Sequence, residues 1–316
     1  PLAGAAVTGA ALSAGLTVAG LPLSAAMRKR ALDAGLATQS WGGWAGDVAK
    51  STAIGAGLAG AGATLATALM RGHGRRWWLP GSAAAAAVAA GMTFAGPVVL
   101  DPLFHRFTPL GDADTREDVL GLAQAAGITV ENVYQVDASR RTSAANAYVN
   151  GLGPTKRVVL FDNLLDAFSR AETRLVVAHE LAHVRHRDVP RGLLHLALVA
   201  PAALRAADRL ARAVDPPAAD RAAPPSLPAL TLALGLVGVT LIGPLHRLSR
   251  AVERRADSFS LELTGDPAAF TSFERRIVVA NLADPDPPRW IAAVLGSHPP
   301  AVERIGMAQA YADRHP

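Results

Sequence analysis

The feature that most constrains the fold is a set of five apolar segments. They are residues 2–27, 52–70, 82–100, 192–204 and 228–245. A helix needs about 20 apolar residues to cross the hydrocarbon core of a bilayer, so segment 192–204 is short and the others are close to sufficient length. The chain is 50% hydrophobic and only 18% charged, which is more apolar than a typical soluble domain. We therefore predict a polytopic helical membrane protein.

Two alternatives to a membrane protein are weaker. A soluble bundle of alanine-rich helices requires polar faces at helical spacing, and segment 82–100 carries none. A nucleic-acid-binding protein would explain the formal net charge of +5, but the arginines flank the apolar runs, which favours lipid headgroups. The chain has no basic run interleaved with aromatic residues and no Cys/His finger spacing, so no nucleic-acid partner is expected. Cysteine is absent, which excludes thiolate metal sites and cysteine nucleophiles.

The strongest chemical signal is the sequence VAHELAH at residues 177–183, an HExxH pattern in a stretch predicted to be helical over 164–187. Residues i and i+4 share a helix face, so His179 and His183 can direct both imidazoles at one metal ion. Glu180 lies beside the first histidine, where it can take a proton from a metal-bound water. A solvated helix with two incidental histidines is the alternative, but apolar residues lead into the motif. We predict one zinc ion per chain.

A catalytic zinc usually takes three protein ligands and keeps one position for water, so one ligand is missing from the motif. We predict that Glu253 is this ligand. Asp257 lies four positions later on the same helix face, where it can accept a hydrogen bond from a ligand imidazole. On spacing alone, a solvated arginine-rich helix explains the two carboxylates equally well. His186 lies among charged neighbours and is interpreted as the end of a helix rather than as a ligand.

Counting the membrane crossings tests whether the two motifs can meet. Five spans would place residues 28–50, 101–191 and 246–316 on one side of the membrane, so HExxH and Glu253 would share a face. Basic residues near the ends of the spans are modestly more numerous on that face, which predicts that it is cytoplasmic. The protein is then integral to the cell membrane, multi-pass, with the catalytic residues on the cytoplasmic side.

The region between the third and fourth apolar segments has strand signals. Residues 128–136 and 156–161 are strand candidates, and 115–126 has helical periodicity. The dipeptide Asn150-Gly151 suggests a turn that closes an exposed strand.

Four regions are therefore predicted, in a fold that is mainly α. Residues 1–100 form three transmembrane helices with loops, and 101–191 form an HExxH catalytic region with a small sheet. Residues 192–246 form a transmembrane helical hairpin, and 247–316 form a C-terminal catalytic region that supplies the third ligand.

Several further blocks stand in one order along the chain. They are LPLS at 21–24, GLATQS at 35–40, DVAK at 47–50, PLF at 102–104, FTPL at 107–110, SAANAYVNGLGPTKRVVLFD at 143–162, then HExxH, Glu253 with Asp257, SHPP at 297–300, and Glu303 with Arg304. In this order they resemble the integral-membrane zinc proteases of the CAAX prenyl protease 1 type. The segment VRHRD at 184–188 is more similar to the related HtpX-type bacterial membrane proteases, so substrate specificity does not carry over.

The resemblance implies a zincin-like catalytic domain and roles for five more residues. Asn146, Ala147 and Tyr148 would form an edge strand that pairs with an extended substrate peptide. His298 would lie near the metal and stabilise the oxyanion, and Arg304 would support that region. Family members have more spans than the five predicted here, so we expect a first helix of the family pattern to lie before the start of this sequence.

Three functions remain open. The first is an endopeptidase that processes a specific membrane-associated or lipidated peptide or protein, and the second is a broad quality-control protease for membrane proteins. The third is a non-catalytic scaffold stabilised by a metal. A scaffold needs ligands but no general base, so an intact Glu180 disfavours it. The first two functions use the same residues, and the sequence does not separate them.

Overall fold

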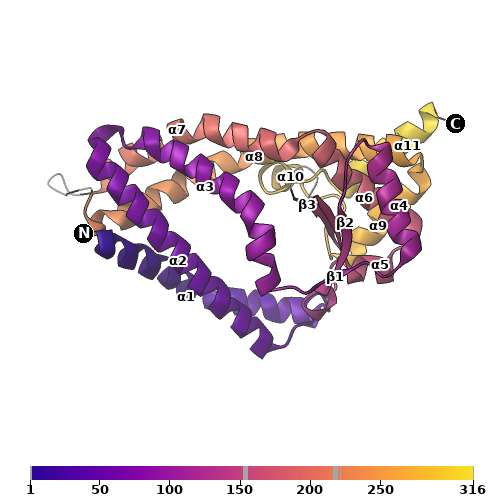
Figure 1. Ribbon diagram of the computed structural model, residues 1–316, viewed down its shortest axis with the longest axis horizontal. Helices are drawn as coiled ribbons and strands as arrows, with labels where there is room; N and C mark the ends of the chain where they lie inside the picture. Colours follow the sequence, from indigo (N-terminus) through magenta and orange to yellow (C-terminus); the bar gives the residue numbers. More distant parts are fainter. Residues whose placement is uncertain (1, 152–155, 216–219, 221, 316) are drawn as a thin grey trace. The chain divides into compact units, whose positions relative to one another are not determined.

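The computed structural model describes residues 2–151, 156–215, 220 and 222–315, and the chain divides into two compact units. The first unit comprises residues 1–30, 39–91 and 192–241, and the second comprises 31–38, 92–191 and 242–316. The first is helical, and the second combines helices with a small sheet (Figure 1), which confirms the mainly α fold with a small sheet.

Four helices in the described part of the chain are long and apolar enough to cross a membrane. They are α1 (Leu2–Asp33), α2 (Trp41–His73), α3 (Trp78–Val99) and α8 (Leu227–Thr264). Each contains one of the predicted apolar segments, which confirms four of the five. The fifth, 192–204, forms the middle of α7 (Asp188–Val214), which does not reach the same hydropathy because charged residues flank this segment. That α7 crosses the membrane stays a prediction.

Small residues allow α1 and α2 to pack closely within the first unit. A Cβ added at Gly9 would lie 2.6 Å from the carbonyl oxygen of Ala59 and 2.6 Å from the Cβ of Ala63. A Cβ at Gly60 would lie 2.9 Å from the carbonyl oxygen of Ala6. The two glycines therefore permit a backbone approach that is typical of helix pairs in membranes.

A buried carboxylate joins α7 to the start of α3. Trp77 Nε1 donates a hydrogen bond of 2.9 Å to Asp208 Oδ1. Arg212 donates to both carboxylate oxygens of Asp208, at 2.8 and 2.9 Å. Because the charge of Asp208 is neutralised and hydrogen-bonded, α7 can place it in an apolar surrounding at reduced cost.

The second unit is built around a four-stranded sheet in the order β1-β2-β4-β3. The strands are β1 (Phe107–Pro109), β2 (Asn132–Val136), β3 (Ala147–Asn150) and β4 (Arg157–Phe161). Strands β2 and β4 are parallel, and the other two pairs are antiparallel. Both strand candidates are confirmed, although β2 begins later than expected, and β3 lies at an edge. The turn predicted at Asn150-Gly151 coincides with the end of β3 and with a φ of 101° at Gly151, and residues 152–155 fall outside the described part of the chain.

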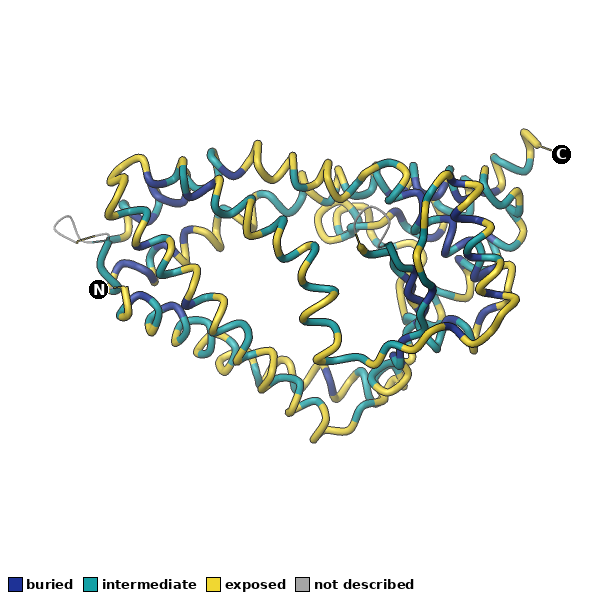
Figure 2. Tube along the Cα trace, viewed as in Figure 1, coloured by how far each residue is buried: buried dark blue, intermediate teal, exposed yellow. Residues whose placement is uncertain are grey.

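The helices α4 (Ala113–Ala125), α5 (Asp162–Ala167), α6 (Arg170–Arg185) and α9 (Pro267–Ala280) share a hydrophobic core with this sheet. The second unit also contains α10 (Arg289–Val294) and α11 (Ala301–Arg314). Fully buried side chains of β4 and α6 meet in the core, among them Val158, Leu160, Val177 and Leu181. Figure 2 marks the buried residues along the chain in dark blue. The apolar side of α6 is thereby fixed against the core, whereas His179, Glu180 and His183 stay partly exposed.

The predicted single helix over 164–187 is two helices, and a capping box explains the break. Ser169 Oγ accepts from the backbone N–H of Glu172, and Glu172 accepts from the backbone N–H of Ser169. The buried Glu172 carboxylate also accepts from Ser272 at 2.8 Å and from Arg276 at 2.6 Å, both on α9. Burial raises the pKa of Glu172, but these hydrogen bonds and Arg276 outweigh it and leave the pKa below the ordinary value. The start of α6 is therefore tied to α9.

Candidate metal centre

The HExxH residues lie on α6 with their side chains directed to one point. His179 Nε2 and His183 Nε2 are 3.2 Å apart, and one ligand atom each from His179, Glu180 and His183 lies within 4.8 Å of the others. This is the arrangement expected of an i, i+4 pair on one helix face.

Helix α8 brings Glu253 to the same point. Glu253 Oε2 lies 3.1 Å from His179 Nε2 and 3.9 Å from His183 Nε2, and the residue is only 8% exposed. Ligands in a tetrahedral zinc site with bonds of ~2.1 Å are about 3.4 Å apart. The three atoms therefore have the spacing of a metal ligand set. Glu180 is the second carboxylate at this point, and burial raises its pKa.

Carboxylates behind the two imidazoles determine which ring nitrogen is available. His179 Nδ1 lies 2.9 Å from Asp257 Oδ1, and His183 Nδ1 lies 3.0 Å from Asp188 Oδ2. When each Nδ1–H donates to its carboxylate, each Nε2 carries a lone pair. Two lone pairs and a carboxylate oxygen then converge with no donor between them, and a cation would relieve the repulsion. The residues present thus fit a metal ion.

The pKa of His179 also indicates that this position suits a cation. Burial lowers its pKa, but the hydrogen bonds that the protonated ring donates to Asp257 and Glu253 outweigh burial and raise the pKa to about 9. The surroundings therefore favour positive charge at this position.

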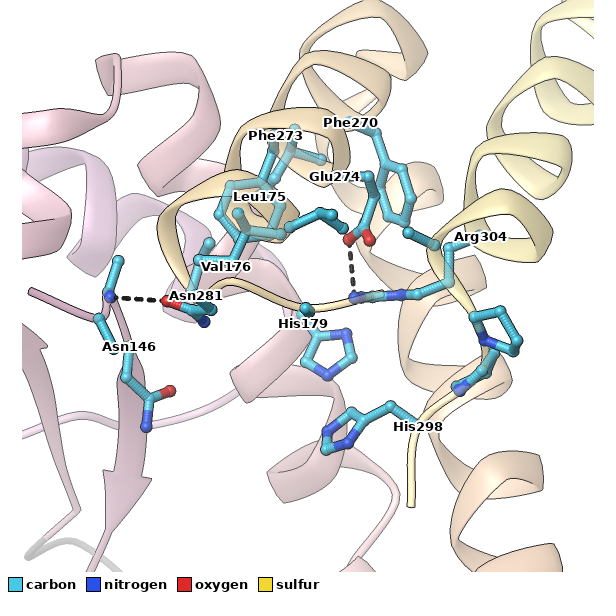
Figure 3. A pocket seen from close by; sticks show the side chains of 18 of the residues that line it. Asn146, Leu175, Val176, His179, Phe270, Phe273, Glu274, Asn281, His298 and Arg304 are labelled. Atoms are coloured by element: carbon cyan, nitrogen blue, oxygen red, sulfur yellow. Dashed lines mark hydrogen bonds and ion pairs between the residues drawn. The ribbon is translucent and has the colours of Figure 1, made fainter. Parts of the chain in front are cut away.

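Arg304 lies behind Asp257 and donates hydrogen bonds to it. Its Nε and Nη2 donate to the two oxygens of Asp257, at 2.8 and 2.5 Å. Its Nη1 lies 2.7 Å from Glu274 Oε1 on α9 (Figure 3). Burial raises the pKa of Glu274 to about 7. Glu274 was not predicted, because nothing in its local sequence distinguishes it from an ordinary helix carboxylate.

Asp188 and Arg255 were also missed. Arg255 on α8 pairs with the Asp188 oxygen that does not face His183. A helix extended past His183 would not place residue 188 beside it. The chain instead turns at Arg187, whose φ of 55° is left-handed, so Asp188 returns toward the site. A left-handed arginine has no sequence signature.

His298, which lies between α10 and α11, also reaches the site. His298 Nε2 lies 3.4 Å from Glu253 Oε2, and its Nδ1 is 2.9 Å from Ser297 Oγ. His186, which was not predicted as a ligand, makes an edge-to-face contact with Phe259, with ring centroids 5.5 Å apart.

A cavity of about 560 Å³ opens beside His179 and Glu180. Its wall is largely apolar and includes Leu175, Val176, Phe270, Phe273 and Ile277, with His298 and Arg304 at one end (Figure 3). Of the three residues expected in the substrate strand, Asn146 lines this cavity and Ala147 and Tyr148 do not. The Tyr148 hydroxyl donates to Asp101 at 3.3 Å. Asn281 accepts from the backbone N–H of Ala145 at 3.2 Å, which ties the segment before β3 to the end of α9.

Comparisons with known proteins agree with this geometry. The model of peptidase family M48 matches residues 109–312. The metalloprotease YhfN of Bacillus subtilis is 31% identical over 302 residues, covering 93% of this chain and 70% of YhfN. A CAAX prenyl protease 1 homologue of Oryza sativa is 31% identical over 229 residues, covering 66% of this chain and 50% of that protein. This chain thus spans about half the length of the rice relative.

The fold has a solved counterpart. The crystal structure of Ste24p from S. mikatae superposes with a TM-score of 0.83 at 22% identity, covering 94% of this chain and 74% of Ste24p. The family match, the fold match and the four apolar helices all indicate the same kind of protein. The chain belongs to peptidase family M48 and is an integral-membrane metallopeptidase.

Proposed function

We propose that this chain is a zinc-dependent endopeptidase that hydrolyses peptide bonds in an extended, membrane-associated peptide or protein. The observation that carries the proposal is the convergence of His179 Nε2, His183 Nε2 and Glu253 Oε2 beside the buried carboxylate of Glu180. Zinc rather than another metal is proposed because two imidazoles and one carboxylate are a common catalytic zinc set.

The residues of the chain have distinct tasks in this proposal. Zinc, when bound, polarises the scissile carbonyl and lowers the pKa of water toward about 7. Glu180 takes the proton of the attacking water and delivers it to the leaving amine. His298, close to Glu253 at the cavity, donates to the oxyanion that develops on the carbonyl. Asp257, held by Arg304, fixes the tautomer of His179.

Substrate orientation is assigned to the edge of the sheet. Among the described residues, strand β3 pairs only with β4, so its other side can add a strand of peptide. Asn146, Ala147 and Tyr148 would hold the peptide extended beside the cavity, which supplies the positional part of the rate.

The membrane topology that we propose rests on the count of crossings and on the basic residues near the span ends. We assign residues 1–100 and 192–246 to the membrane, and 101–191 and 247–316 to the catalytic side, which we propose is cytoplasmic. The modest excess of basic residues near the span ends on the catalytic side supports this orientation.

Glu180→Gln tests the proposal. The variant should keep one zinc per chain and lose cleavage of a quenched fluorescent peptide, because it removes the base and leaves the ligands. Glu262→Gln, an exposed position on α8, is the control and should keep both properties. Loss of zinc in Glu180→Gln, or retained cleavage, would reject the role of Glu180.

Three functions that could use this site differ in what the variant should do in cells. A processing protease should leave one or two precursors accumulating in cells that carry Glu180→Gln, some of them lipidated if the relatives' name reflects a shared substrate class. A quality-control protease should leave many membrane proteins accumulating. A metal-stabilised scaffold predicts no difference between the wild type and the variant.

A further inference from the structure

His183 has its own carboxylate and arginine, arranged like those behind His179. On one imidazole, Asp257 accepts from Nδ1 and is held by Arg304. On the other, Asp188 lies 3.0 Å from His183 Nδ1 and is held by Arg255. The two carboxylate–arginine pairs come from different parts of the fold, since Asp188 begins α7 whereas Asp257 lies on α8.

We propose that Asp188, held by Arg255, is a positioning residue for the metal. It keeps the proton of His183 on Nδ1, so that Nε2 points to the metal as a lone pair. Arg255 neutralises the Asp188 oxygen that does not face the histidine, and it lies two residues from Glu253 on the same helix. One turn of α8 therefore supplies a ligand and, through Arg255 and Asp188, the orientation of another. This inference rests on the zinc site of the proposed function.

The two carboxylate–arginine pairs differ in burial, which sets how strongly the loss of each carboxylate should weaken zinc binding. Asp257 is fully buried, with an exposed side-chain fraction of 0%, and Arg304 is 14% exposed. Asp188 is 11% exposed and Arg255 is 40% exposed. Water screens the pair of Asp188 and Arg255 more strongly, so losing Asp188 should weaken zinc binding less than losing Asp257.

A purely local role is the competing explanation for Asp188. As an acid in the first turn of α7, it also has a favourable interaction with the helix N-terminus. That role predicts a lower melting temperature for Asp188→Asn but an unchanged affinity for zinc in the folded protein. Zinc affinity therefore separates positioning from helix stabilisation.

The test is zinc affinity by chelator competition in detergent-solubilised full-length protein, together with the visible absorption of the Co²⁺-substituted form. Asp188→Asn should bind zinc about 10-fold more weakly, Asp257→Asn up to about 100-fold, and the Co²⁺ spectrum of each should change. Asp118→Asn is the matched control. Asp118 is 13% exposed and also pairs with two arginines, Arg170 and Arg174, and these three residues lie outside the metal site.

A second variant covers the case in which Asp188→Asn does not fold. Arg255→Gln leaves Asp188 in place and should weaken zinc binding several-fold, and Arg255→Lys should restore part of the loss. Failure of the wild-type protein to bind zinc would overturn the proposed function and this inference with it. A wild-type protein that binds zinc, with unchanged affinity in Asp188→Asn or, failing that, in Arg255→Gln, would overturn only the role of Asp188.

Discussion

His179 Nε2 and Glu253 Oε2 lie 3.1 Å apart although the two residues are separated by 74 positions in the sequence. The chain between them includes all of α7 and the apolar half of α8. A metal held by both residues would therefore bridge the HExxH helix and the C-terminal half of α8. Its binding free energy would contribute to holding these distant segments together.

This contact leads to a prediction about the order of two effects on zinc. Glu253→Ala should lose most of the bound zinc, because it removes one of three ligands. Asp257→Ala should only weaken binding, by about 10- to 100-fold, because it removes a partner of a ligand. Zinc content per chain and chelator competition measure both, with Glu262→Ala as the exposed control on the same helix. Full zinc content in Glu253→Ala would reject its assignment as a ligand.

How much of the site the sequence predicts depends on how local each part is. His179, Glu180 and His183 lie within one helical turn and a half, so their spacing alone brings them together. Glu253 needed the count of crossings and the resemblance, since spacing left an ordinary ion-paired helix open. Asp188 could not be found, because its position depends on the left-handed turn at Arg187.

The fold shows the same dependence on range. Hydropathy finds four membrane helices because burial in lipid leaves a continuous apolar run. It is ambiguous for α7, where arginines at 191 and 205 closely flank the apolar segment and Asp208 follows. The break between α5 and α6 was predictable, because Ser169 and Glu172 have the spacing of a capping box. The sheet order was not predicted, because β4 pairs in parallel with β2 across about 25 residues of chain and sequence patterns do not encode such a pairing.

The register of β3 indicates which backbone amide would meet a substrate. Phe161 N–H donates to the carbonyl of Asn146 at 3.1 Å, and Tyr148 lies opposite Val159. Hydrogen-bonded pairs alternate in an antiparallel ladder, so Tyr148 pairs with β4 and Val149 directs its N–H away from β4. Val149 is thus the position at which proline removes an outward donor.

Val149→Pro should therefore raise the KM for an extended peptide and lower kcat/KM by about 5- to 13-fold, since one backbone hydrogen bond to substrate contributes about 1–1.5 kcal/mol. Zinc content should not change. Tyr148→Phe is the control, since it keeps every backbone donor and removes only the hydroxyl that contacts Asp101. Normal kinetics in a folded, zinc-loaded Val149→Pro protein would reject strand addition at this edge.

Glu172 should be a large contributor to the stability of the catalytic unit. Glu172→Ala leaves Ser169, Ser272 and Arg276 without their shared acceptor, and we expect a loss of about 1–3 kcal/mol in the free energy of unfolding. Thermal unfolding of purified protein measures it, with the exposed Glu117→Ala on α4 as the control.

The effect of Glu172 should depend on pH in a defined direction. Its pKa is lowered in the folded protein, so its contribution is fully present above the unfolded pKa near about 4.3. The contribution is lost as the pH falls through the lowered folded pKa. The difference in melting temperature between the wild type and Glu172→Ala should shrink accordingly on acidification. A difference that grows on acidification would contradict the assigned direction.

The site also constrains the topology of α7. If α1, α2, α3 and the apolar half of α8 cross the membrane, an uncrossed α7 would leave Glu253 on the opposite side from His179. The 3.1 Å contact between these residues forbids that arrangement. Helix α7 has 27 residues, which is long enough for a span, and its buried Asp208 is paired.

We therefore expect α7 to cross the membrane, and single cysteines can test this because the chain has none of its own. Arg75→Cys, between α2 and α3, and Ala213→Cys, at the end of α7, should react with a membrane-impermeant maleimide from the same side. Asp313→Cys, near the end of α11, should react only from the opposite side, which is the cytoplasmic one if the proposed orientation holds. All three positions are exposed, so accessibility within the protein does not decide the result. Labelling of Ala213→Cys and Asp313→Cys from one side would show that α7 does not cross, and the shared site would then require that α8 does not cross either.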